Sequence, residues 1–211
     1  VFERVLPGPD RMYPDTDSAP IPIRDATVEA LKNDSILSPQ QRIEQMNRWK
    51  VPADTYTFLL KRNYFPLMKR IVEELEYPPS FVGAILGHRL KHVEGQLGYR
   101  EDFDPSLIYD LFQGVAERKL CRDILPVLFF PVYRENRCHF PTLLKKIHYV
   151  RSSDREIQTE LQRLVSRSQK TVNAKNPQSR IRWIMGKIRP LALGNIPLAR
   201  LREELTGEIH G

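Results

Sequence analysis

The placement of the prolines constrains the fold of this chain more than any other feature of its sequence. Seventeen of the 211 residues are proline, and eight of them open or directly precede apolar residues spaced three or four apart. Proline is favoured at the first position of an α-helix, because its φ angle is preset and no N–H is needed there. The eight are Pro39, Pro52, Pro66, Pro79, Pro105, Pro141, Pro177 and Pro197. Strictly alternating, strand-like runs are scarce, so the pattern predicts an all-α fold.

Three segments of different character follow one another along the chain. Residues 1–24 are rich in proline and show no helical period, so we interpret them as extended chain, either the end of a preceding domain or a linker. Residues 25–150 carry repeated apolar stripes and are predicted to form a multihelical domain. Residues 151–211 are predicted to form a small basic tail of three helices.

The helices of the tail are delimited by local signals. The first starts at a capping box, Ser153-Asp154-Arg155-Glu156, in which the serine and the glutamate each accept from the other's backbone N–H. The second and third begin at prolines named above. We expect them to end at Pro190 and Gly207, because proline and glycine interrupt helices.

The positive charge of the chain is concentrated in this tail. The whole chain has 33 Lys and Arg against 26 Asp and Glu, a net charge of +7. Residues 163–202 contain ten Lys or Arg and no acidic residue, so the rest of the chain carries −3. Solvated charged faces usually mix both signs, and the absence of acids therefore indicates a polyanionic partner such as nucleic acid.

Eight basic residues of this stretch are the predicted phosphate contacts. Spacing of i, i+4 and i+7 places Arg163, Arg167 and Lys170 on one face of the first expected helix. On the second, residues seven apart pair Arg180 with Lys187 and Arg182 with Arg189, and Lys175 lies in the turn between the two helices. The set is Arg163, Arg167, Lys170, Lys175, Arg180, Arg182, Lys187 and Arg189. Two alternatives stay open, namely a basic face that only solvates the protein and a protein-interaction module that docks an acidic partner without RNA.

Residues suited to catalysis or metal binding do not form a recognisable set. His88 and His92 share a helix face but have no evident third ligand, so no metal site is predicted. The two cysteines, Cys121 and Cys138, are expected to be free thiols. A self-contained enzyme would need a cluster such as Cys121 with His139 and His148, for which the spacing gives no support. We expect no catalytic site in these residues.

The sequence also carries indications of cellular context. No apolar run approaches the roughly 20 residues of a membrane span, and no signal peptide is evident, so we expect a cytoplasmic protein without membrane contact. The chain begins at Val1 without a lead-in to a helix. We interpret it as a fragment of a longer polypeptide.

Three motifs resemble one protein family. The opening segment 4–17, RVLPGPDRMYPDTD, resembles the B/E-subunit family of tRNA-dependent amidotransferases and looks most like the E type. Residues 81–91, FVGAILGHRLK, are similar to a helix of that family. The segment IMGKI at 184–188, followed by GNI at 194–196, resembles its C-terminal tail. Residues 120–125 and Pro190 depart from the family pattern.

The resemblance implies a fold and a function. It implies that the chain is the end of a catalytic cradle, a helical domain and a GatB/YqeY-like tail. Family members convert Glu-tRNA(Gln) to Gln-tRNA(Gln) with ATP and ammonia, and ATP and Mg²⁺ belong to the cradle rather than to this chain. The implied partners are tRNA, which the tail grips by shape and phosphate contacts, and the amidase subunit of the complex. The chain is then a non-catalytic part of a carbon–nitrogen ligase.

Overall fold

The computed structural model describes residues 24–26, 37–171 and 176–210. The described residues contain helices and no strand, so the predicted all-α fold is confirmed. The chain divides into two compact units, 1–38 and 39–211, and nearly all the described residues belong to the second. The expected remnant at residues 1–24 lies almost entirely outside the described residues, and the predicted divisions after residues 24 and 150 stay predictions.

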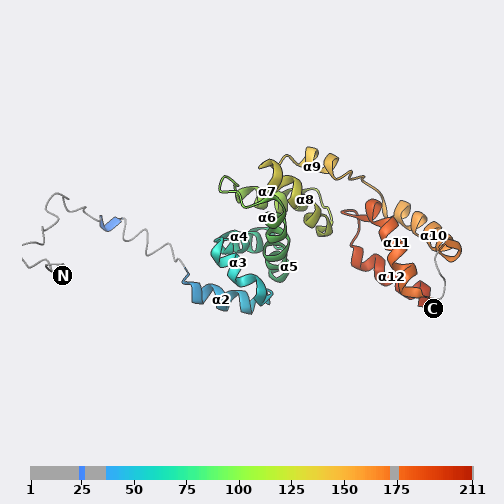
Figure 1. Cartoon of the computed structure of the whole chain (residues 1–211), viewed down its shortest axis with the longest axis horizontal. Helices are drawn as coiled ribbons and strands as arrows, with labels where there is room; N and C mark the ends of the chain where they lie inside the picture. Colours follow the sequence, from blue (N-terminus) through green and yellow to red (C-terminus); the bar gives the residue numbers. More distant parts are fainter. Residues whose placement is uncertain (1–23, 27–36, 172–175, 211) are drawn as a thin grey trace, which may run out of the picture. The chain divides into compact units, whose positions relative to one another are not determined.

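Helices succeed one another closely along the second unit (Figure 1). In its first part they are α2 (Pro39–Arg48), η2 (Ala53–Thr55), α3 (Tyr56–Lys61), α4 (Phe65–Leu75), α5 (Pro79–Ala84), η3 (Ile85–Leu90), α6 (Lys91–Leu97), α7 (Ser106–Glu117), η4 (Arg122–Ile124), α8 (Leu125–Glu135) and α9 (Phe140–Lys146). The last three, which we call the tail helices, are α10 (Asp154–Thr171), α11 (Pro177–Ala192) and α12 (Leu198–His210).

The proline signals predicted the helix starts well. Each of the eight prolines is the first or second residue of a helix, or directly precedes one. The two predicted ends in the tail are wrong. Helix α11 continues through Pro190 to Ala192, and α12 continues through Gly207 to His210. Burial of Ala192 and partial burial of Ile209 in the tail core favour the longer helices over the local breaking tendency.

Buried hydrophobic residues stabilise both parts of the unit. In the first part, α7 packs against α4 and α8, and buries large residues such as Phe112, Phe129 and Tyr133. The tail helices pack α10 on α11 and α11 on α12 around Ile157, Ile184 and their neighbours. Each fully buried leucine or isoleucine contributes roughly 1.5–3 kcal/mol, so these stripes account for the helix pairing.

Close backbone packing explains the glycines at the centre of the longest helical run of the first part, residues 79–97. A Cβ atom added to Gly87 would lie 2.2 Å from the Cβ atom of Thr55. One added to Gly83 would lie 2.4 Å from a methyl group of Val51. Both glycines contact the segment between α2 and α3, and their absence of a side chain lets that segment approach the helical run.

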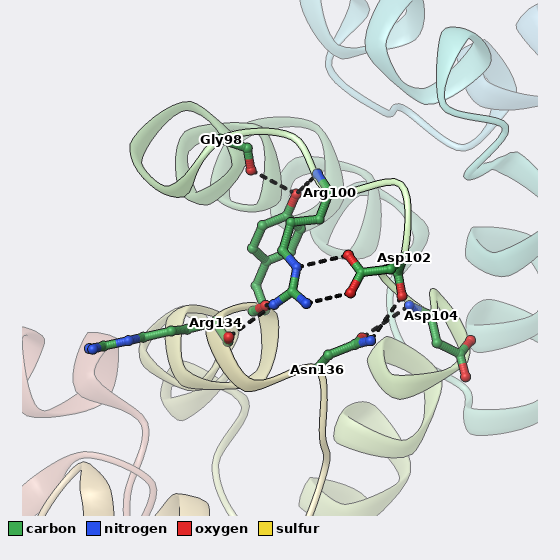
Figure 2. A network of polar contacts seen from close by, with 7 residues as sticks. Gly98, Arg100, Asp102, Asp104, Arg134 and Asn136 are labelled. Atoms are coloured by element: carbon green, nitrogen blue, oxygen red, sulfur yellow. Dashed lines mark hydrogen bonds and ion pairs between the residues drawn. The ribbon is translucent and has the colours of Figure 1, made fainter.

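A polar network fixes the loop after α6 (Figure 2). The Arg100 guanidinium donates to both carboxylate oxygens of Asp102, at 3.0 and 2.6 Å, and to the backbone carbonyl of Arg134 at 3.0 Å. Asn136 donates to the carbonyl of Asp102 at 2.8 Å and accepts from the Asp104 N–H at 3.1 Å. Arg100 therefore stabilises a loop and the end of α8.

Candidate nucleic-acid interface

Capping residues fix where the tail helices begin, and the start of each helix determines which of its side chains face the solvent. Ser153 and Glu156 form the predicted capping box, in which the Glu156 carboxylate accepts from the Ser153 N–H at 2.7 Å. These hydrogen bonds lower the pKa of Glu156. At α11, the Asn176 side chain accepts from the N–H groups of Gln178 and Ser179, and Pro177 occupies the first helical position. The apolar faces then pack together and leave the basic faces outside.

A shallow groove of about 430 Å³ lies between α11 and α12, and we call it the α11–α12 groove. Its apolar part is formed by Ile181, Met185 and Leu198. Its basic part is formed by three arginines from two helices. The full lining is Gln178, Ile181, Arg182, Met185, Gly186, Arg189, Leu198 and Arg202.

The three groove arginines have the properties of an anion-binding set. Arg182, Arg189 and Arg202 are all exposed. The groove lining contains no carboxylate, and none of the three side chains forms an ion pair or hydrogen bond among the residues that the structure describes. A guanidinium group presents several N–H donors in a plane, which suits the oxygens of a phosphate. The groove therefore offers three guanidinium groups to an anionic ligand.

The remaining predicted phosphate contacts differ in their exposure and in their partners within the protein. Arg163 on α10 is 72% exposed and pairs with Glu160 at 3.3 Å, an exposed pair of little strength. Arg167 is exposed on the same helix, and Lys187 is exposed on α11. The half-buried Arg180 instead donates to the Ser168 hydroxyl at 3.3 Å, which ties α11 to α10.

Two of the predicted contacts cannot be placed. The side chains of Lys170 and Lys175 lie outside the described residues. The structure thus brings Arg182 and Arg189 together in one groove, leaves three further predicted cations exposed, and uses Arg180 within the fold.

Arg202 is a groove residue that was not among the predicted contacts. The nearby Arg200 has Glu204 four residues ahead and pairs with it at 2.9 Å. Arg202 has Thr206 at that position and so has no acidic partner within its own helix. This difference in the i+4 residue was a usable signal, because an arginine without a helical partner is free to bind elsewhere.

The other residues considered for chemistry are not among the described lining of this groove. His88 is bound to the Asp54 carboxylate at 2.8 Å. Cys121 and Cys138 are free thiols, as expected, and burial raises the pKa of Cys138 to about 11. Within residues 24–26, 37–171 and 176–210, no three His, Cys, Asp or Glu side chains gather as metal ligands. None of the described helices is long and apolar enough to cross a membrane.

Known proteins similar to this chain are E subunits of glutamyl-tRNA(Gln) amidotransferase. The chain is 27% identical over 128 residues to that of Methanobrevibacter smithii, covering 58% of this chain and 20% of that protein. It is 21% identical over 216 residues to that of Saccharolobus solfataricus, covering 99% and 33%. It is 23% identical over 224 residues to that of Methanococcus vannielii, covering 100% and 34%.

The chain is therefore similar, at low identity, to subunits of glutamyl-tRNA(Gln) amidotransferases. Within that class, several E-type relatives align with most of its length, which supports its assignment to the E-subunit family that the sequence motifs indicated. The chain spans about a third or less of the length of these relatives. No protein-family model matches the chain, and no solved structure matches it significantly.

Proposed function

We propose that this chain is the tRNA-binding C-terminal part of an E-type subunit of Glu-tRNA(Gln) amidotransferase. The observation that carries the proposal is the α11–α12 groove, which is lined by three exposed arginines and, among the described residues, by no carboxylate. The groove lies in a stretch of forty residues with ten cations and no acid. The relatives are named for a tRNA substrate, which is a polyanion of the kind that this surface suits.

Binding would rest on phosphate contacts and shape. Arg182, Arg189 and Arg202 would hold phosphates at the groove, and exposed cations on α10 and α11 would extend the contact. Folded RNA is recognised largely through its backbone, its 2′-hydroxyls and its shape, so such a surface suits the outside of a tRNA. The chain itself would supply binding and no chemical step.

The reaction would belong to the rest of the subunit. A parent enzyme of this family would use ATP and Mg²⁺ to activate and then aminate the glutamate on tRNA(Gln), together with an amidase subunit. That ATP and metal binding belong to that other part and not to this chain stays a prediction.

A salt titration tests the binding. With about six phosphate contacts, the slope of log K against log salt should be about −4 to −5, by the rule of ~0.7–0.9 per contact. The measurement is the affinity for tRNA(Gln) at several salt concentrations by fluorescence anisotropy. An absent or salt-independent interaction would contradict the proposal.

Charge reversal then locates the contact. The double variant Arg182→Glu, Arg189→Glu should abolish tRNA binding and keep the helical circular dichroism spectrum. The matched control reverses two exposed cations outside the tail helices, Lys91→Glu with Arg137→Glu, which changes the net charge equally. If both double variants lose affinity to the same degree, the groove is not the site.

The alternative function is a protein-interaction module. The apolar residues of the groove would suit a partner subunit with an acidic docking surface. In that case the reversal variant would lose the partner subunit in a pull-down, while tRNA would show no measurable binding to either form of the chain.

A further inference from the structure

Hydrogen bonds in both directions connect the tail helices to the first part of the unit. We call this set of contacts, between residues 121–123 and 194–198, the joint. The backbone N–H of Cys121 donates to the carbonyl of Gly194 at 2.8 Å. In the opposite direction, the N–H of Leu198 donates to the Asp123 carboxylate, also at 2.8 Å. The joint thus connects η4 to the turn between α11 and α12.

A second set of contacts closes around the same turn. The Tyr149 hydroxyl donates to the Asn195 side-chain oxygen at 2.6 Å, and the Asn195 amide donates to the carbonyl of Val150 at 2.7 Å. Gly194 has a φ angle of +80°, and a Cβ atom there would lie 2.8 Å from the Ile124 side chain. The turn therefore requires glycine for both its backbone conformation and its space.

Asp123 supplies a cap that the residue directly before α12 cannot supply. The residue before the helix is Pro197, which has no polar side chain to accept from the first N–H groups. A carboxylate at a helix N-terminus both accepts a hydrogen bond and interacts favourably with the helix dipole. The acceptor comes from 75 residues earlier in the sequence.

The cap also bears on the α11–α12 groove. Leu198, whose N–H is held by Asp123, lines the groove. Arg202 lies four residues further on, on the same side of α12. Loosening the first turn of α12 would therefore displace one wall of the groove together with one of its three arginines.

We propose that Asp123 is a positioning residue for RNA binding: by capping α12 across the joint, it makes the groove and the segment around η4 move as one piece. The part that concerns RNA rests on the proposed function, whereas the joint itself does not. RNA held in the groove is then presented at a fixed place relative to the helices before the tail.

Amide hydrogen exchange tests the joint without RNA. In Asp123→Ala the N–H of Leu198 should exchange roughly fivefold faster, as expected for a lost cap. The N–H of Cys121 should accelerate to a similar degree, although its own acceptor, the Gly194 carbonyl, is untouched. Asp123→Asn keeps an oxygen acceptor and should restore most of the protection at both sites.

The matched control is Asp104→Ala. Asp104 accepts at 2.8 Å from the N–H of Ser106, the first residue of α7, so it caps a helix within its own segment. This variant should leave Leu198 and Cys121 unchanged relative to the core amide of Ile184. Faster exchange of Leu198 with Cys121 unaffected in Asp123→Ala would overturn the proposal, because Asp123 would then be a local cap only.

The affinity for tRNA tests the part of the proposal that concerns RNA. The affinity for tRNA should fall about fivefold in Asp123→Ala and recover in Asp123→Asn. This is the effect expected if the whole free-energy cost of the lost cap appears as weaker binding at the groove. Equal tRNA affinity in wild type and Asp123→Ala would refute the positioning role. A wild-type chain that bound no tRNA would refute the proposed function instead, and amide exchange would still decide whether the joint is a single unit.

Discussion

At the scale of single residues, the neighbours of an arginine decide what it is free to bind. Arg180 and Arg182 are two positions apart on α11, yet they do different things. Arg180 is half-buried and donates to Ser168, whereas Arg182 is exposed at the rim of the α11–α12 groove. The first ties two helices together, and the second keeps its donors available for an anion.

This contrast gives a prediction for single substitutions. Arg202→Ala should weaken tRNA binding about fivefold and reduce the magnitude of the salt slope by about one, because it removes one phosphate contact. Arg180→Ala should leave the slope unchanged and lower the free energy of unfolding by about 1 kcal/mol, since it loses one hydrogen bond. Anisotropy titrations and urea unfolding separate the two effects. A larger loss of slope in Arg180→Ala than in Arg202→Ala would contradict the assignment.

The sequence predicted part of the groove lining. Seven-residue spacing placed Arg182 and Arg189 on one helix face, because helical periodicity is a local property, and both residues line the groove. Their contact with phosphate stays a prediction. The spacing assigned Arg180 the same role, since spacing does not reveal that Ser168 on another helix accepts from it. Arg202 was missed because its place in the groove depends on how α12 packs against α11.

At the scale of elements, two glycines of the same helical run differ in how closely a neighbouring segment packs against their backbone. Gly87 and Gly95 lie in the same helical run of residues 79–97. Gly87 meets Thr55 at a distance that leaves no room for a methyl group, while a Cβ atom at Gly95 would have nothing within 4 Å. The first position is set by packing and the second only by helix propensity.

Alanine substitutions should therefore have opposite effects. Gly87→Ala should lower the free energy of unfolding by about 1–3 kcal/mol, because the added methyl group overpacks the contact with Thr55. Gly95→Ala should raise it by up to ~1 kcal/mol, because alanine is the better helix former. Urea unfolding followed by circular dichroism measures both. Equal effects at the two positions would contradict a close contact between Gly87 and Thr55.

Helix starts could be read from the sequence more accurately than helix ends. Proline and the Ser153–Glu156 capping box act within one turn, so local signals were sufficient for the starts. The ends of α11 and α12 depend on the burial of residues beyond Pro190 and Gly207 in the tail core, which the local sequence does not contain.

At the scale of the whole molecule, the tail offers a basic surface without a platform for stacking bases. Trp183 is the only aromatic residue between positions 163 and 202, and it is partly buried against the tail core. Proteins that bind single strands usually combine positive charge with exposed aromatic rings. The described surface of the tail has the charge and not the rings.

The molecule should therefore prefer folded RNA. At about 150 mM salt, tRNA should bind at least roughly tenfold more tightly than an unstructured single strand of the same length, because shape rather than stacking would provide the selectivity. Competition between the two RNAs in one anisotropy experiment measures the ratio. Equal competition would mean that the surface responds to charge alone.

The joint was the feature least accessible from sequence. Its partners are ordinary residues, an aspartate, a glycine and an asparagine, and the hydrogen bond of Asp123 to Leu198 spans 75 positions. No periodicity links such residues. The fold class and the helix starts were predictable because they depend on neighbours, whereas the attachment of the tail depends on tertiary packing.

The cap that Asp123 provides also bears on how the chain matures during synthesis. Asp123 leaves the ribosome 75 residues before Leu198, so its carboxylate is already available when the start of α12 emerges. Domains tend to fold in order of synthesis, and here the earlier helices carry the acceptor that the last helix needs. The final helix would thus be completed on a template that its own upstream sequence has built.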